Sequence, residues 1–173
     1  MSPRVQTFAW RLLRKALPTG KRAGKFSKHI QPECSRCGLL EDEMHMLFLC
    51  PFSKAAWFCH PWYIRTETLA ALHHNIPGMI QFLLSSSHPQ INVDSLYTFL
   101  WCLWKARNDC LFNRKCSRPI HVFAASNAIM QGSKLEGPRF LEDNKATKHS
   151  HPSGVLAQIT SNHVGNSIFC DAA

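Results

Sequence analysis

Hydrophobic residues recur at helical spacing near the start of the chain. At about 100° per residue, one arc of the segment 3–16 collects apolar side chains and another collects basic ones. The apolar arc holds Val5, Ala9, Leu12, Leu13 and Ala16, and the basic arc holds Arg4, Arg11 and Lys15. The pattern predicts an amphipathic helix over 3–16. We expect it to end at Leu17-Pro18-Thr19-Gly20, because proline and glycine both oppose continuation of a helix.

Helical patterns continue along most of the chain. They predict helices over 41–49, 53–59, 92–114 and 119–131, and one or two helices over 66–86 around Pro77-Gly78. Residues 20–33 are expected to form a basic loop or a short second helix. The stretch Leu96–Trp104 is apolar nearly all round, which indicates a buried helix.

The composition changes after residue 131. Small, polar and basic residues dominate 132–165, and such a segment buries too little apolar surface to offset its ordering entropy. We therefore expect a flexible linker there. The last stretch, 166–173, looks like the start of a β-strand.

Cysteine and histidine residues cluster between positions 34 and 50. Cys34 and Cys37 are two residues apart, which allows a tight turn to aim both sulfurs at one point, and Gly38 suits the close backbone approach of such a knuckle. His45 and Cys50 follow at spacings found in structural Cys₃His zinc sites. On an ideal α-helix His45 and Cys50 would lie about 140° apart. A bend at Cys50-Pro51 is therefore expected to turn the sulfur back toward the metal.

Four protein ligands would fill a tetrahedral shell around Zn2+ and leave no position for water, so the site is predicted to be structural rather than catalytic. Three thiolates and one divalent ion carry a net charge of −1, which Arg36 or Lys54 could partly balance. The alternative is that the four residues are unrelated and some are buried as small apolar groups.

The other cysteines and histidines show no second metal spacing. Cys59 and His60 are rival ligands, but we expect the helix around Trp57 to carry them away from the site. For Cys102, Cys110 and Cys116 we expect burial or chance surface positions. No apolar segment typical of a signal peptide follows Met1, so a reducing compartment, nucleus or cytoplasm, is expected, where clustered cysteines indicate metal more often than disulfides.

The charge of the chain is concentrated at one end. The formal net charge is +9, and residues 1–32 contain eight basic side chains and no acid. A one-sided basic segment is typical of a partner rich in phosphates, although it could also be only a solvated face. The predicted contacts with RNA or DNA are Arg4, Arg11, Lys15, Lys21, Arg22, Lys25 and Lys28. No apolar run reaches the roughly 20 residues of a membrane span, so no membrane partner is expected.

Two aromatic residues, Phe8 and Trp10, lie at the edges of the apolar arc of the first helix. They could stack on nucleic-acid bases, as aromatic residues do in single-strand binders. The favoured alternative is that both pack against the zinc region.

Residues 3–57 together resemble the zinc-binding region that follows the polymerase domain in plant non-LTR retroelement reverse transcriptases. The matching residues are Pro3-Arg4-Val5-Gln6-Thr7-Phe8-Ala9-Trp10-Arg11, Leu17-Pro18-Thr19, Cys34-x-x-Cys37, His45, Cys50-Pro51 and Trp57. Trp104-Lys105-Ala106-Arg107-Asn108-Asp109, with Phe112-Asn113, is similar to the helical stretch that such proteins carry next. Phe169–Ala173 is similar to the opening strand of a ribonuclease H-like domain.

The resemblance implies a role in handling the RNA or DNA of a retrotransposon. Asp171 would match the first metal-binding acid of the ribonuclease H family, but metal-assisted hydrolysis needs several ligands, so no nuclease activity is expected. We find no phosphate loop or nucleophile elbow and expect no enzyme. Glu41-Asp42-Glu43 is interpreted as the acidic first turn of a helix.

The sequence thus predicts a mainly α chain: a zinc-binding domain over 1–65, a helical extension over 66–131, a linker over 132–165 and a truncated strand over 166–173. The predicted function is a structural-zinc, nucleic-acid-binding module. One alternative is a module that binds a protein, such as a flanking polymerase, through the apolar helix 92–114. Exposure of Trp101 and Trp104 would favour it. Another alternative is a retroelement fragment without function.

Overall fold

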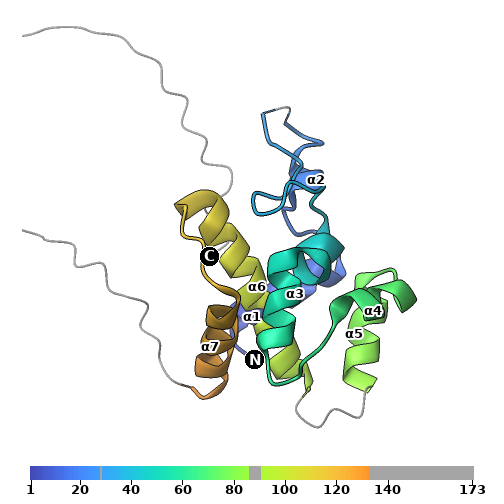
Figure 1. Ribbon diagram of the computed structural model, residues 1–173, viewed down its shortest axis with the longest axis vertical. Coiled ribbons are helices and arrows are strands. Elements are labelled where there is room, and N and C mark those ends of the chain that lie inside the picture. Colours follow the sequence, from blue (N-terminus) through green and yellow to red (C-terminus); the bar gives the residue numbers. More distant parts are fainter. Residues whose placement is uncertain (28, 86–90, 133–173) are drawn as a thin grey trace, which may run out of the picture. The chain divides into compact units, whose positions relative to one another are not determined.

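The computed structural model describes residues 1–27, 29–85 and 91–132, and these lie in a compact unit, Met1–Leu135 (Figure 1). The predicted linker beyond Gly132, the predicted strand over 166–173 with Asp171, and Lys28 lie outside the described residues. The described part is mainly α, as predicted, and contains no strand beyond an isolated bridge between Glu33 and Leu40. The helices are α1 (Pro3–Leu13), α2 (Gly20–Ala23), the π-helix η1 (His45–Leu49), α3 (Pro51–Cys59), α4 (Thr66–Leu72), α5 (Ile76–Ser85), α6 (Val93–Asn113) and α7 (Pro119–Met130).

Helix α1 ends three residues earlier than its sequence pattern predicts. It begins with Pro3 in its first turn and with the Ser2 hydroxyl accepting the Val5 N–H. Lys15 adopts a left-handed φ of 52°, and the Ala16 N–H donates to the Arg11 carbonyl at 2.8 Å. This is the hydrogen-bond pattern of a Schellman cap, formed here on lysine rather than glycine. The helix therefore stops before Pro18.

The described residues 66–85 form two helices, but the break does not fall at Pro77. Helix α4 ends at Leu72, and α5 starts at Ile76 with Pro77 and Gly78 in its first turn. Proline is tolerated there because the first N–H groups of a helix have no intrahelical partner. The Asn75 side chain instead accepts the Gly78 N–H at 2.8 Å.

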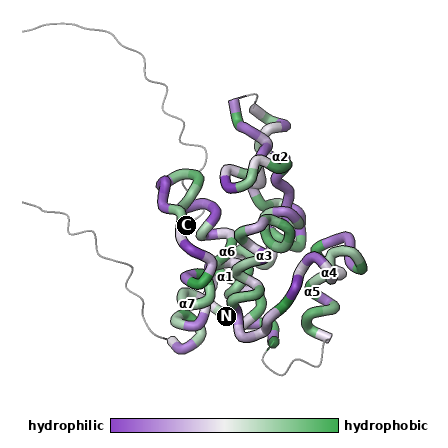
Figure 2. Tube along the Cα trace, viewed as in Figure 1, coloured by the Kyte–Doolittle hydropathy of each residue, from purple (hydrophilic) through white to green (hydrophobic). Residues whose placement is uncertain are grey.

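Helix α6 lies at the centre of the described unit (Figure 1) and contacts α1, α7 and η1. Helix α1 runs beside it in the same direction, since the Met1 amine pairs with Asp94 (3.1 Å) and Phe8 contacts Trp104 (5.7 Å between ring centroids). Figure 2 shows hydrophobic residues along α6 and the helices around it, whereas the segment carrying α2 contains many hydrophilic residues. The predicted burial of Leu96–Trp104 is confirmed, with only Trp101 half-buried.

Aromatic rings fill the contact between α3, η1 and α6. Trp57 is fully buried, stacks on Phe48 (5.4 Å) and meets Phe99 edge-on (4.8 Å). His60 lies in the same cluster, 4.9 Å from Phe99, and Cys59 is exposed. The expectation that α3 carries Cys59 and His60 away from the cysteine cluster agrees with these positions.

The expectation of burial or a chance surface position for Cys110 and Cys116 did not include a bond between them, but a disulfide joins them. Arg114 ends α6 with a left-handed φ of 53°, which turns the chain back and brings the two α-carbons to 4.4 Å. The spacing of the two cysteines along the chain does not indicate this turn. Cys102 is buried, as expected, and its burial raises its pKa to about 12.

A buried ion pair connects α6 to the loop before η1. The Arg107 Nε donates to Glu41 Oε2 at 3.1 Å, and its Nη2 donates to Oε1. Glu41 Oε1 also accepts the Gly20 N–H at 2.9 Å at the start of α2. Gly20 also lies close to the backbone of Pro32, where a Cβ would be only 2.7 Å from the carbonyl oxygen, so this position requires glycine. Glu41 is thus a buried residue that links α6 to the start of α2. This corrects its interpretation from sequence as an acid in the first turn of a helix.

Replacement of Glu41 by alanine would leave the Arg107 charge buried without its partner. We expect a loss of about 3–5 kcal/mol in the free energy of unfolding. Urea unfolding of the zinc-saturated protein measures it. The double variant Glu41→Leu with Arg107→Met should recover most of the loss, because no unpaired charge remains.

The matched control is Lys105→Ala, which removes the exposed partner of Asp109 at 3.9 Å. It should change the unfolding free energy by no more than about 0.5 kcal/mol. Equal losses in Glu41→Ala and Lys105→Ala would contradict the connecting role of Glu41.

Candidate metal centre

The four predicted ligands come together in the structure. One ligand atom from each of Cys34, Cys37, His45 and Cys50 lies within 4.8 Å of the other three. The Sγ atoms of Cys34 and Cys50 are 3.9 Å apart, and Cys37 Sγ lies 3.2 Å from His45 Nε2. Cys34, His45 and Cys50 are buried and Cys37 is half-buried. Among the residues that the structure describes, no other such group of ligands occurs.

These separations fit a tetrahedral zinc site. Zinc lies about 2.3 Å from each sulfur, so two sulfurs of a tetrahedral shell are about 3.8 Å apart. A separation of 3.9 Å between Cys34 and Cys50 matches that edge and is nearly twice the length of a disulfide bond. The cluster is therefore suited to holding zinc with four protein ligands.

The first two ligands sit on a tight knuckle. The Cys34 carbonyl accepts the N–H groups of Cys37 (3.3 Å) and Gly38 (2.8 Å), and the Cys34 N–H donates to the Leu39 carbonyl at 2.7 Å. Gly38 has a φ of 74°, which glycine adopts without strain. The predicted tight turn is confirmed, but Gly38 serves it through this φ and not through a close backbone approach, since a Cβ there would have no heavy atom within 4 Å.

The second pair of ligands is brought together by a π-turn rather than by an α-helix. The Cys50 N–H donates to the His45 carbonyl at 2.7 Å, an i→i+5 hydrogen bond. This bond places Cys50 about one turn beyond His45 on the same side, instead of about 140° away as on an α-helix. The predicted bend is also present, with a ψ of 136° at Cys50 and Pro51 in the first turn of α3.

Three carbonyls at the end of the π-turn are satisfied by side chains from outside it. Pro51 has no N–H to offer the Met46 carbonyl, which accepts the Ser53 hydroxyl instead at 2.6 Å. The Trp57 indole donates to the Leu47 carbonyl at 2.8 Å, and the Thr66 hydroxyl donates to the Phe48 carbonyl at 2.5 Å. All three donors are buried. Sequence reasoning missed these roles, because nothing in the spacing of the ligands indicates a π-turn.

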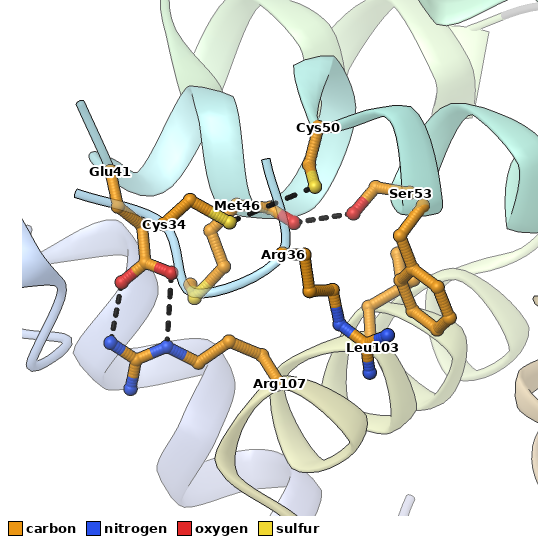
Figure 3. A pocket seen from close by; sticks show the side chains of 9 residues that line it. Cys34, Arg36, Glu41, Met46, Cys50, Ser53, Leu103 and Arg107 are labelled. Atoms are coloured by element: carbon orange, nitrogen blue, oxygen red, sulfur yellow. Dashed lines mark hydrogen bonds and ion pairs between the residues drawn. The ribbon is translucent and has the colours of Figure 1, made fainter. Parts of the chain in front are cut away.

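Arg36 is a cation that lines the same cavity as the sulfurs of Cys34 and Cys50. Its guanidinium lies 3.7 Å from the Phe52 ring centroid and donates through Nη2 to the Ala106 carbonyl of α6 at 3.1 Å. Burial lowers the pKa of Arg36, and the charges of Cys50 and Cys34 oppose that change. The expectation that Arg36 could balance the site charge fits this position. Figure 3 shows Arg36, Cys34 and Cys50 around the same small cavity as Glu41 and Arg107.

The thiols of Cys34 and Cys50 shift each other's pKa in opposite directions. The hydrogen bond from Cys50 lowers the pKa of Cys34 to about 4, and the same hydrogen bond, together with burial, raises the pKa of Cys50. Zinc requires both thiolates, so its binding releases protons, and its affinity falls as pH decreases.

Residues 1–57 match the family model described as zinc-binding in reverse transcriptase. The match contains all four ligands and confirms the resemblance of this part of the chain. No curated protein and no solved structure matches the chain. The resemblance of the C-terminal stretch to a ribonuclease H-like strand, and a plant origin, stay predictions.

The zinc-binding region carries most of the predicted nucleic-acid contacts on its surface. Arg4, Lys15 and Lys25 are exposed and Arg11 is half-buried. Two other cations make contacts within the protein, since Lys21 pairs with Asp42 (3.6 Å) and Arg22 donates to the Lys15 carbonyl (2.5 Å).

Among the described helices, none is long and apolar enough to cross a bilayer.

The two aromatic residues of α1, Phe8 and Trp10, differ in their exposure to solvent. Phe8 is buried, as the favoured interpretation expects, but the ring it contacts is Trp104 of α6 rather than a residue of the zinc-binding region. Trp10 is 60% exposed, so the expectation that it packs against the zinc-binding region is wrong. The buried face of α1 consists of Val5, Phe8, Ala9 and Leu12. It is rotated toward Phe8 relative to the predicted arc, which leaves Trp10 on the opposite side.

Substitution of any of the four ligands should weaken zinc binding. Cys50→Ser, for example, removes one of three thiolates. The expected loss of zinc affinity exceeds the roughly 10- to 100-fold that removal of an outer-shell partner costs. Competition with a chromophoric chelator measures this affinity.

Cys59→Ser is the matched control, because Cys59 is exposed and lies outside the cluster. Its zinc affinity should equal that of the unaltered chain. A variant with Cys50→Ser that binds zinc as tightly as Cys59→Ser would contradict the proposed ligand set.

Proposed function

We propose that this chain is a structural-zinc module that binds RNA or DNA through its basic N-terminal segment. In this account it derives from a retroelement reverse transcriptase and acts in the nucleus or cytoplasm. The observation that carries the proposal is a set of exposed cations on the zinc-binding region, in a segment of eight basic residues and no acid. Among the described residues, the charged groups of Arg4, Arg11, Lys15 and Lys25 make no ion pair or hydrogen bond. They are therefore available to phosphates.

The zinc site supports this function by holding the basic segment in place. Glu41 lies between the ligands Cys37 and His45, and its backbone carbonyl accepts the Lys21 N–H at 2.9 Å while its side chain accepts the Gly20 N–H. The start of α2 is thus attached to the loop that the metal closes. Arg22 continues the connection to the end of α1.

The proposed module has no polymerase or nuclease activity of its own. Three sulfurs and one imidazole complete a tetrahedral zinc shell, so no position is left for the water that catalytic zinc sites activate. The match to a zinc-binding region, which is not a catalytic domain, supports the same view. Metal-dependent cleavage of an RNA–DNA hybrid by the pure chain would contradict it.

The alternative of a protein partner on the apolar helix loses its main support. Trp104 is 6% exposed and packs on Phe8, while Trp101 is half-buried. Helix α6 contacts α1, α7 and η1 within this chain, and its exposed apolar side chains, Val93, Leu111 and Phe112, lie at its two ends. We therefore favour nucleic acid as the partner.

Salt titration of nucleic-acid binding tests the proposal. Each phosphate contact contributes about 0.7 (single strand) to 0.9 (duplex) to the negative slope of log affinity against log salt concentration. The triple variant Arg4→Ala, Arg11→Ala, Lys25→Ala should therefore bind more weakly and reduce the slope by about 2 to 3. Fluorescence anisotropy with labelled oligonucleotides measures both quantities.

The matched control removes three exposed cations elsewhere, by Arg65→Ala, Lys105→Ala and Arg118→Ala. It should keep the slope of the unaltered chain. Affinity that does not depend on salt, or equal losses in the two triple variants, would count against binding through the N-terminal segment.

A further inference from the structure

The Trp10 side chain lies on the surface of α1, away from the core. Val5, Phe8 and Leu12 of the same helix are 1–3% exposed, and Trp10 is 60% exposed. At about 100° per residue, Trp10 points away from the arc of these three residues. Most of this large aromatic side chain is exposed to solvent among the described residues and is available to a partner.

A basic side chain accompanies the indole. The Arg14 guanidinium lies 5.7 Å from the Trp10 ring centroid, one helical turn farther along α1. Arginine over tryptophan is a favourable cation–π arrangement, and it leaves much of the ring open here. Leu13, 49% exposed, extends the apolar part of this surface. We call Trp10, Leu13 and Arg14 the Trp10 surface.

The charge around the Trp10 surface indicates the chemistry of its partner. The surface lies in the segment 1–32, which contains basic residues and no acid. A partner that matches it carries both planar rings and negative charge. Nucleotides have both, and an aromatic side chain can stack on a base of any identity, because every base has a π-face.

We propose that the Trp10 surface is a stacking platform for an unpaired base, so that the chain prefers single-stranded nucleic acid to duplex. In a duplex the faces of the bases are covered by their neighbours, and only phosphates and groove edges are accessible to Arg14 and the other cations. The inference rests on the proposed function and adds the strandedness of the partner to it.

A second exposed ring lies in the same basic segment. Phe26 is 83% exposed and follows Lys25 in the turns after α2. Arg22, four residues before it, donates to the Lys15 carbonyl at the end of α1. Phe26 thus gives the basic segment a second ring on which a base can stack.

The chain offers a matched control for the stacking role. Phe58 on α3 is 50% exposed, and the Arg65 guanidinium lies 5.8 Å from its ring centroid. It shares the aromatic–arginine pairing of Trp10, but it lies in the part of the chain where basic and acidic residues are nearly balanced. Phe58→Ala should leave binding unchanged.

The test compares Trp10→Ala, Trp10→Phe and Phe58→Ala in the zinc-loaded full chain. Anisotropy is measured with a poly(dT) or poly(U) strand of about 20 nucleotides, longer than the site of a known single-strand binding fold, and with a duplex of equal length. The unaltered chain should bind the single strand more tightly than the duplex. Trp10→Ala should lower single-strand affinity by about 5- to 100-fold. Its duplex affinity should stay unchanged, and Trp10→Phe should keep most of the single-strand affinity.

Several outcomes would overturn the inference. Equal binding of both nucleic acids, or a Trp10→Ala variant that binds the single strand as tightly as Phe58→Ala, would refute stacking while leaving salt-dependent binding through Arg4, Arg11 and Lys25 intact. A dimer of the unaltered chain that Trp10→Ala converts to a monomer, measured by light scattering, would instead assign the surface to self-association. Absence of binding to either nucleic acid would remove the proposed function together with this inference.

Discussion

The convergence of four ligands on one point is the constraint on which the rest of the described structure depends. It joins the knuckle at Cys34 and Cys37 to the π-turn at His45 and to the start of α3 at Cys50. The loop between Cys37 and His45 carries Glu41, and the side chain of Glu41 reaches both Arg107 on α6 and the start of α2. The metal site thus fixes a short loop, and that loop connects the basic N-terminal segment to the central helix.

The same constraint explains the local geometry around the ligands. Turning Cys50 toward His45 requires an i→i+5 turn followed by an abrupt bend, and this arrangement deprives three backbone carbonyls of helical partners. The chain supplies Ser53, Trp57 and Thr66 to satisfy them. Trp57 also fills the aromatic core, so one residue links the ligand geometry to the packing of α3 and α6.

The identity of the ligands and the positions of most helices could be predicted from sequence, because both depend on local spacing. The spacing of the four ligands indicates the zinc site from sequence alone, and the apolar run in α6 indicates its burial. Features that depend on tertiary context could not be predicted. The sequence around Glu41 is typical of a surface acid, because its ion-pair partner, Arg107, lies far along the chain. The exposure of Trp10 follows from a small rotation of the buried face of α1, and the Cys110–Cys116 disulfide follows from a left-handed turn at Arg114.

We infer that zinc in this four-ligand site holds the helical unit together. The most direct measurement is circular dichroism of the purified chain, with its metal content determined before and after treatment with a chelator. We expect one zinc per chain, because one four-ligand cluster is present in the described part. Helical structure should be lost on chelation and recovered when zinc is returned, since binding to such sites contributes on the order of 10 kcal/mol to folding. A chain that is free of metal and keeps its full helical signal and thermal stability would rule out this role of zinc.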